Sequence, residues 1–346
     1  MRGGTKINYW NSDSMKALVT GASGFTGSYM VKNLLEHGYN VRVFVRPDSN
    51  ISVLKDLPVE YSFGDLRHKN QVHEAVQGVD VVFHIAALYR SANVPDNVYW
   101  DINVKGTEHM LQAAVDAGVK RFLHCSTCGV HGHIKSPPAN EDAPIQPEDV
   151  YQQSKYEGEK LTLRFYQEKG LPVTIVRPVG IYGPGDTRML KLYSSVQKQR
   201  FLLFGSGEVL YHLTFVTDTV EGFRLAAENP AAIGQTFIIA GEHYTTLKDF
   251  AALVAKELGV PAPRWKLPVW PLEIAAYVCE KICVPLRVEP PIFPRRVHIF
   301  THDRAFDISK AKAELGYTPR VNMQDGIHHT AEWYIEKGFL DKRTPS

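Results

Sequence analysis

The first half of the chain alternates short apolar runs with segments of helical period. Apolar runs of strand length lie at 16–20, 41–45, 59–63, 79–87, 119–126 and 171–178. Segments with apolar residues at helical spacing lie between them, at about 26–37, 69–77, 101–117 and 151–169. Strands that alternate with helices in this way form a parallel sheet covered on both faces. The pattern therefore predicts an α/β fold with a doubly wound parallel (Rossmann) sheet, whose ligands bind at the carboxyl ends of the strands.

The pattern changes after about residue 180, where Pro, Gly and aromatic residues become frequent. A helix is still expected at 246–258, and the apolar segment 234–241 is expected to return to the sheet. The interpretation divides the chain into three parts: a flexible leader at 1–14, a dinucleotide-binding Rossmann domain at 15–180, and a smaller substrate-binding lobe at 181–346, partly interleaved with that domain.

Composition narrows the class of protein. Hydrophobic residues make up 44% and charged residues 22%, and the formal net charge is +2, so no nucleic-acid partner is expected. The longest apolar stretch, 267–286, contains three prolines, Glu273, Glu280 and Lys281, which argues against a membrane span. Four cysteines in a chain of 346 residues do not make a disulfide framework, so a reduced, cytoplasmic setting is expected.

Two cysteine pairs were considered as metal or redox sites. Cys125 and Cys128 form a CxxC, but no second CxxC or HxH lies at zinc-finger spacing, and the pair follows a strand-like run. Cys279 and Cys283 are four residues apart on an apolar helical stretch, which is typical of core cysteines. We therefore expect no metal.

A glycine-rich turn follows the first predicted strand, in the sequence TGASGFTG at 20–27. Gly21 permits a tight turn, Gly24 lets the backbone approach a pyrophosphate, and Gly27 lets the helix pack closely on the strand. The N-terminus of the helix then offers free N–H groups and a partial positive charge to the phosphates. We therefore expect a dinucleotide here, bound by Gly21, Ser23, Gly24, Phe25, Thr26 and Gly27.

The GxxGxxG spacing of this turn resembles that of the short-chain dehydrogenases. Six further motifs follow in the order of the extended branch of that superfamily: GDL at 64–66, HIAA at 84–87, NVKGT at 103–107, CST at 125–127, YQQSK at 151–155 and RPVGIYGPG at 177–185. Over roughly 15–335 the chain thus resembles the NAD-dependent epimerase/dehydratase superfamily. The resemblance implies that Asp65 binds the adenine amino group and that other cofactor contacts come from Leu66, Ala86, Ala87 and Pro178. It also implies a small-molecule substrate and a homodimer joined through the helices at 101–117 and 151–169.

The candidate catalytic residues begin with Tyr151 and Lys155, four positions apart at the start of a predicted helix, so both project from one face. An isolated tyrosine has a pKa of about 10. A neighbouring ammonium favours the phenolate and can also hold the nicotinamide ribose, so Tyr151 is expected to exchange the substrate proton. By resemblance, Thr127 hydrogen-bonds the substrate oxygen and Asn103 supports the site. Thr127 is preferred to Ser126 because it stands at the family position before VHG and because neighbours on a strand face opposite sides.

The second predicted strand ends in VFVRPDSN, which bears on the choice of cofactor. NAD enzymes usually carry an acidic residue here, which binds the ribose 2′-OH and repels a 2′-phosphate. This chain has Val45 and then Arg46, and an arginine can pair with a phosphate. NADP(H) is therefore favoured over NAD(H); the alternative is that Arg46 is a solvated surface cation.

Two classes of enzyme fit these motifs. Nucleotide-sugar epimerases with tightly bound NAD commonly have Asn where this chain has Gly180, and a diphosphate-binding Arg where it has Tyr211. Without both contacts, the chain more closely resembles dihydroflavonol reductase and the 3β-hydroxysteroid dehydrogenase-like group. We expect an NAD(P)-dependent oxidoreductase of a secondary alcohol or ketone, with the epimerase as the alternative. A non-catalytic NADP-binding regulator is more remote, and a 4,6-dehydratase is disfavoured because Cys128 and Gly129 replace its Asp-Glu pair.

Aromatic residues recur in the apolar, proline-interrupted part of the lobe. They are either the wall of a pocket for an apolar substrate or the core of the lobe. An anionic substrate remains an alternative, because the lobe also carries three arginines, Arg295, Arg296 and Arg304. The aromatic positions are Trp265, Trp270, Tyr277, Phe293 and Phe300.

Overall fold

The structure is a computed structural model that describes residues 15–89, 94–283, 285–286, 288, 291–292 and 294–341. The expected leader at 1–14 and the aromatic position Phe293 lie outside the described residues, as do the side chains of Arg295 and Arg296.

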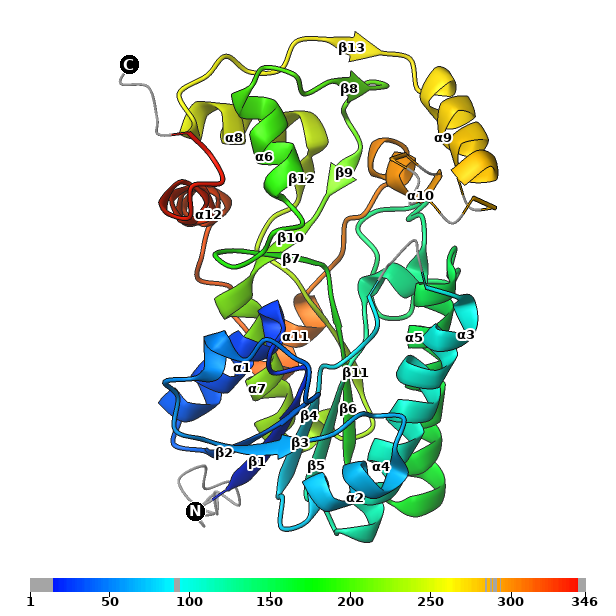
Figure 1. The fold of residues 1–346 in the computed structure, drawn as a ribbon, viewed down its shortest axis with the longest axis vertical. Coiled ribbons are helices and arrows are strands. Elements are labelled where there is room, and N and C mark those ends of the chain that lie inside the picture. Colours follow the sequence, from blue (N-terminus) through cyan, green and yellow to red (C-terminus); the bar gives the residue numbers. More distant parts are fainter. Residues whose placement is uncertain are drawn as a thin grey trace, which may run out of the picture.

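A parallel sheet occupies the centre of the molecule, with helices on both faces (Figure 1). Its seven strands lie in the order β11-β6-β5-β4-β1-β2-β3, which reverses between β1 and β4. They are β1 (Lys16–Thr20), β2 (Asn40–Val45), β3 (Val59–Phe63), β4 (Val81–His84), β5 (Arg121–Cys125), β6 (Val173–Pro178) and β11 (Thr236–Ile239). β4 and β6 are buried along their whole length, which explains why their sequences are largely continuous apolar runs. The predicted doubly wound sheet is confirmed, and its switch point lies at the carboxyl ends of β1 and β4.

Two layers of helices bury the faces of the sheet. One layer contains α1 (Phe25–Glu36), α7 (Val216–Glu228) and α11 (Ser309–Leu315), and the other contains α2 (Lys69–Val76), α4 (Gly106–Asp116) and α5 (Val150–Lys169). Short helical turns are η2 (Ser52–Leu54), η4 (Cys128–His131) and η5 (Pro230–Ala232). Because β11, α7 and α11 come from the second half of the chain, that half supplies part of the sheet and of one helical layer, as expected for 234–241.

The remaining elements form the lobe above the sheet (Figure 1). A third apolar core lies there, and it includes Tyr193, Phe250 and Tyr334. The lobe strands pair two by two, β7 with β10, β9 with β12 and β8 with β13. The elements are β7 (Gly180–Tyr182), α6 (Leu190–Gln197), β8 (Leu203–Phe204), β9 (Leu210–Tyr211), β10 (Leu213–Phe215), β12 (Thr245–Thr246), α8 (Leu247–Glu257), β13 (Lys266–Leu267), α9 (Trp270–Cys283), α10 (Pro294–Val297), η6 (His298–Phe300) and α12 (Met323–Glu336).

The segment predicted as one helix at 101–117 is not a single α-helix. It consists of α3 (Asp96–Tyr99), a π-helical segment η3 (Trp100–Lys105) and α4. The π-helix lies where Asn103 bonds to a neighbouring loop, and such insertions are common near functional sites.

Three of the five aromatic positions singled out in the lobe follow neither of the two predictions made for them. Trp265, Trp270 and Tyr277 are 73%, 63% and 57% exposed, so they belong neither to the core nor to a pocket wall. Phe300 is half-buried and packs on Phe204, with 5.2 Å between ring centroids. Among the described residues, no helix combines the length and the apolar character needed to cross a bilayer.

Candidate functional site

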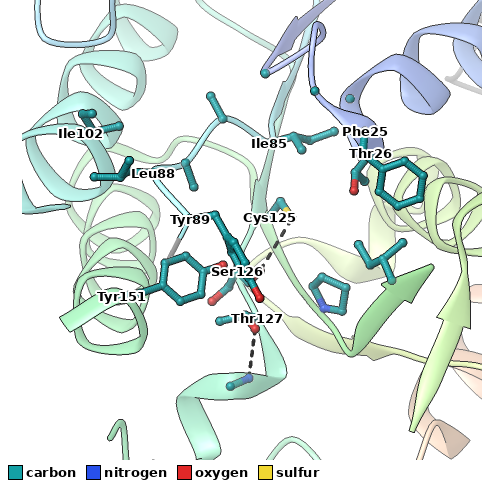
Figure 2. Close-up of a pocket in the computed structure, with 18 of the residues that line it drawn as sticks. Phe25, Thr26, Ile85, Leu88, Tyr89, Ile102, Cys125, Ser126, Thr127 and Tyr151 are labelled. Carbon is teal, nitrogen blue, oxygen red and sulfur yellow. Dashed lines mark hydrogen bonds between the residues drawn. The ribbon is translucent and has the colours of Figure 1, made fainter. Parts of the chain in front are cut away.

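A cleft of about 670 Å³ lies at the carboxyl ends of the strands, between the sheet and the lobe. Figure 2 shows Tyr151 and Thr127 reaching into it, with Phe25 and Thr26 of the glycine turn across the space. Most of the candidate site residues meet here. Those that line the cleft are Gly21, Ser23, Gly24, Phe25, Thr26, Gly27, Arg46, Asp65, Leu66, Ala86, Ala87, Thr127, Tyr151 and Pro178.

At Gly21 and Gly27, the glycine turn has no room for a side chain. Gly21 has a φ of +73°, and a Cβ atom there would lie 2.9 Å from the backbone of Ala86. A Cβ atom on Gly27 would clash with the carbonyl oxygen of Gly21, so only glycine fits at this position. The helix α1 starts after Gly24 without a side-chain cap. Its first N–H groups therefore remain for an anion, which fits the pyrophosphate of a dinucleotide.

A buried chain of hydrogen bonds holds the end of β4 against this turn. The hydroxyl of Thr20 accepts from the N–H groups of Ile85 and Ala86, at 3.1 and 3.0 Å, which ends β4 at His84 rather than at the predicted residue 87. The ring of His84 joins Thr20 (2.9 Å) to Thr107 (3.0 Å).

The ring of His84 must be neutral to complete this chain. The hydroxyl of Thr107 donates to the carbonyl of Asn103, so it accepts from Nε2 of His84, and the Nδ1 atom accepts from Thr20. Burial lowers the pKa of His84 to about 3, in agreement with that state. Sequence reasoning noticed HIAA as a motif but missed Thr20 and Thr107 as its partners.

Tyr151 and Thr127 reach the cleft from different elements. Tyr151 lies in the first turn of α5, whose start is capped by the carboxylate of Asp149, which accepts from the N–H of Gln152 (2.8 Å). Thr127 precedes η4 and accepts from the N–H of Gly129 at 3.0 Å.

Contrary to the prediction, Ser126 and Thr127 do not alternate across a strand. β5 ends at Cys125, so strand alternation does not apply to the two residues, and both line the cleft. The Ser126 hydroxyl is buried without a protein hydrogen-bond partner, whereas that of Thr127 has one. Ser126 is therefore a further polar group of the site that the sequence argument set aside.

Lys155 and Asn103 stand behind the cleft rather than in its lining. Lys155 is fully buried one helical turn after Tyr151, and burial lowers its pKa although Cys125 and Glu159 oppose that shift. Asn103 accepts from the N–H of Leu88 (2.7 Å) and donates to the hydroxyl of Ser154 (3.0 Å). Asn103 thus ties the loop after β4 to the first turn of α5.

The expected adenosine end of the cleft carries Arg46 and Asp65. Arg46 follows β2, its side chain is 58% exposed, and it lies 3.5 Å from Asp48. The carboxylate of Asp65 accepts two hydrogen bonds from the side chain of Arg67, at 3.0 and 2.7 Å, and these lower its pKa. A cofactor that bonded to Asp65 would share it with Arg67.

The opposite side of the cleft contains residues that sequence reasoning missed. The ring of Tyr89 meets that of Tyr151 edge-on, with centroids 5.1 Å apart. The guanidinium of Arg188 lies 5.6 Å from the centroids of both Tyr89 and Phe25, and it pairs with Asp186 at 2.7 Å. Arg188 comes just after the GPG turn of the RPVGIYGPG motif, a proximity that could have drawn attention to it.

The lobe closes this side with Tyr211, His212, Arg304 and Phe306. Burial raises the pKa of Tyr211 to about 12, although Arg304 opposes that shift. Tyr211 therefore enters the cleft as a neutral phenol at the position where sugar epimerases would place an arginine.

The CxxC cysteines are packed into the structure. Cys125 and Cys128 are both buried and free, and Cys128 donates to the carbonyl oxygen of Arg177 at 3.0 Å. Burial raises the pKa of Cys125 to about 11, so its thiol stays protonated near neutral pH.

Comparison with known proteins extends this description. Residues 17–240 match the model of the NAD dependent epimerase/dehydratase family. A 3beta-hydroxysteroid-dehydrogenase/decarboxylase (isoform 1) of Arabidopsis thaliana is 32% identical, over 91% of this chain and 78% of the relative. A putative dihydroflavonol 4-reductase of Synechocystis is 29% identical, over 97% of this chain and 99% of the relative. The crystal structure of DesIV, a dTDP-glucose 4,6-dehydratase from Streptomyces venezuelae with NAD bound, superposes with a TM-score of 0.77 at 27% identity, covering 94% of this chain and 99% of that one.

Proposed function

The chain belongs to the NAD-dependent epimerase/dehydratase family, and we propose that within it Tyr151 is the acid/base of an oxidoreductase that interconverts a secondary alcohol and a ketone. The protein is an NAD(P)-dependent oxidoreductase. The observation that supports the role of Tyr151 is its position in one cleft with Thr127 and the glycine turn. The substrate-binding part of the chain is proposed to be 181–346.

The proposed mechanism uses few side chains. The nicotinamide, when bound, supplies or accepts the hydride. Thr127 and Ser126 hold the substrate oxygen beside Tyr151, which gives a proton to a ketone or takes one from an alcohol. The ammonium of Lys155, which is buried behind the cleft one helical turn after Tyr151, favours the phenolate of Tyr151 when the proton has left. Asn103 keeps the first turn of α5 in place through Ser154.

The cofactor is proposed to be NADP(H) rather than NAD(H). Arg46 lines the cleft at the end of β2 and is largely exposed, so it is available to a 2′-phosphate. Asp48 lies 3.5 Å from Arg46 in an exposed ion pair, which contributes little. A doubly charged 2′-phosphate would therefore bind Arg46 in place of Asp48.

The substrate is proposed to be an apolar molecule that carries an acid group. Ile85, Leu88 and Ile181 give the cleft apolar walls, and two arginines also line it: Arg304, and Arg188 with its partner Asp186. A carboxylate attached to the carbon beside the reacting carbon would be bound by such cations. The name of the 3beta-hydroxysteroid-dehydrogenase/decarboxylase relative is compatible with this class. Comparing the turnover of a β-hydroxy acid with that of its methyl ester tests it; equal turnover of the two would exclude the acid.

Two further features of the protein are proposed: its assembly and its setting. The exposed sides of α4 and α5 are proposed to join two copies into a homodimer, as in the family that the motifs resemble. A reduced, cytoplasmic setting is proposed because all four cysteines are free. Light scattering after gel filtration would test the dimer, and a monomeric mass at micromolar concentration would exclude it.

The experiment for the main proposal is Tyr151→Phe. Removing only the hydroxyl leaves the packing of the ring on Tyr89 and removes the proton donor, so kcat is expected to fall roughly 10²- to 10⁴-fold. NADPH binding, followed by fluorescence, is expected to stay within about twofold. Net consumption of NADPH with a ketone separates the oxidoreductase from an epimerase, which consumes none. Unchanged turnover in the variant would contradict the role of Tyr151.

A further inference from the structure

The helix α9 turns its apolar side away from the protein. Within Trp270–Cys283, a stretch described throughout, Ala276 is the one buried residue. Residues at i, i+4, i+7, i+8 and i+12 share one side of a helix. On α9 these are Trp270, Ile274, Tyr277, Val278 and Ile282, and all of them are roughly half exposed or more. A surface helix of a globular protein normally shows the reverse, with its apolar side toward the core.

The segments on either side of α9 extend this surface. Trp265 and Leu267 precede the helix, and Leu286 and Val288 follow it; all four are substantially exposed. Three aromatic side chains in the surface expose on the order of 400 Å² by themselves, which is already the size of the largest apolar patch on a typical monomer. Figure 1 shows α9 at the outer edge of the lobe, apart from α6, α8 and α12. The helix that carries this surface therefore lies at the periphery of the lobe.

Cations lie on the apolar side of α9 and in the exposed segment that precedes it. Lys281 lies in the middle of the apolar side, with its ammonium 5.6 Å from the ring of Tyr277, and Lys266 and Arg264 are exposed at its N-terminal end. Glu273 and Glu280 are seven residues apart and lie together along one margin of the helix, nearer to the side of Ala276. The outward side thus combines apolar side chains with cations.

We propose that α9, with its flanking residues, docks the lobe on the surface of a lipid bilayer that contains anionic lipids. Tryptophan and tyrosine prefer the boundary between headgroups and acyl chains, and lysine reaches the phosphates from an apolar side. A helix of this composition lies in the plane of the interface and needs no span. We favour a bilayer over a protein partner because a fluid interface adapts to a helix that exposes aromatic rings along its side.

Docking would place the cleft close to the phase in which an apolar substrate dissolves. The lobe that carries α9 also supplies Tyr211 and Arg304 to the cleft. The docking does not depend on the proposed reaction, because it rests on α9 alone. Reduction of a ketone dissolved in water is therefore expected to be the same in a docking variant as in the wild-type protein.

The test is flotation of the full chain with phosphatidylcholine vesicles, with and without phosphatidylglycerol. The wild-type protein is expected to float with the mixed vesicles, with a blue shift of its tryptophan fluorescence. The triple variant Trp270→Ser, Ile274→Ser, Tyr277→Ser is expected to lose at least about tenfold in vesicle partitioning. The double variant Lys266→Gln, Lys281→Gln is expected to lose only the additional binding that phosphatidylglycerol confers.

A matched control changes three exposed apolar residues elsewhere, Val53→Ser, Phe63→Ser and Phe339→Ser, which are 48%, 53% and 47% exposed. It is expected to float like the wild type. NADPH binding and the midpoint of thermal unfolding show that each variant is folded. The proposal is overturned if the wild-type protein stays in the aqueous fraction with both kinds of vesicle, or if the triple variant floats as well as the control. It is also overturned if α9 instead mediates a dimer, seen as a mass that halves in the triple variant.

Discussion

Two helices of the lobe that follow one another in the sequence, α8 and α9, contain similar apolar residues but differ in burial. The apolar residues of α8 are buried: Leu247, Phe250, Ala251, Val254 and Ala255. The polar residues of α8 lie on its other side, and the helix packs into the lobe core with α6 and α12. In α9 the apolar side is the exposed one, and only Ala276 is buried. Apolar content therefore does not decide burial; a helix is buried only where another element offers a surface to cover it.

The same contrast holds for ionisable groups. His84 and His124 are buried beside Lys155 and are held neutral, whereas Arg46 is exposed and keeps its charge available. Interior groups should therefore control stability, and exposed groups should control what the protein binds.

The largest effect is expected from the interior side of the comparison. Phe250→Ala removes a fully buried ring that packs on Tyr211, with centroids 5.5 Å apart. The free energy of unfolding is expected to fall by roughly 3–5 kcal/mol, because the lobe core cannot close the cavity. Urea unfolding measures it. A loss below about 1 kcal/mol would mean that α8 is no more embedded than α9.

A second effect concerns the buried histidines and pH. Burial lowers the pKa of His84 to about 3 and that of His124 well below its usual value. Below pH 6.5 the unfolded chain binds protons that the folded chain does not, so stability is complete above that pH and is lost as the pH falls toward 3. Each histidine contributes up to about 1.4 kcal/mol per pH unit.

Urea unfolding at pH 7 and pH 5 measures this slope for the wild-type protein and for His84→Gln. The variant removes one titrating group and should show the smaller loss between the two values. Equal losses in both proteins would indicate that His84 is accessible to protons in the folded state.

A third effect belongs to the exposed side of the comparison. Arg46→Ala is expected to weaken NADPH binding roughly tenfold or more, since a hydrogen bond to a charged group contributes about 1.5–3 kcal/mol. NADH binding and the unfolding midpoint should not change. Fluorescence titration with both cofactors measures the ratio. If the two affinities fall together, Arg46 is not reading the 2′-phosphate.

The smallest effect is expected for α9 itself. Trp270→Ala should change the free energy of unfolding by less than about 0.5 kcal/mol, although a tryptophan is lost, because its ring is 63% exposed. The paired measurement on Phe250→Ala gives the scale. A loss of several kcal/mol would show that Trp270 is covered in solution.

Much of the fold could be predicted because its signals are local. The form of an element follows from neighbouring residues where its pattern of apolar positions or its turn sequence is local. Examples are the strand at 59–63, the helix at 151–169 and the turn TGASGFTG. The elements that were wrong depend on distant partners. β4 is shorter than predicted because Thr20, 65 residues from Ile85, takes the N–H groups that would have extended it. The helix at 101–117 contains a π-helix where Asn103 bonds to Leu88.

The candidate site shows the same division. Tyr151, Lys155 and the three glycines could be proposed from their spacing. Two residues four positions apart on a helix share one side, and glycines three positions apart shape one turn, so neither arrangement depends on distant parts of the chain. Tyr89 and Ser126 reach the cleft because the strands that precede them, β4 and β5, end at the same edge of the sheet, whereas Arg188 is added by the second half of the chain.

The sequence by itself determined the doubly wound sheet, the dinucleotide turn and the order of the family motifs, since each is written in residues close together along the chain. Only the tertiary structure decided that Lys155 and Asn103 stand behind the cleft, that Arg188 and Arg304 face it, and that the apolar side of α9 points outward. The physical reason is that a side chain is buried only when a second part of the chain covers it. A periodic pattern states which side of a helix is apolar, but whether another element covers that side is settled by the path of the whole chain.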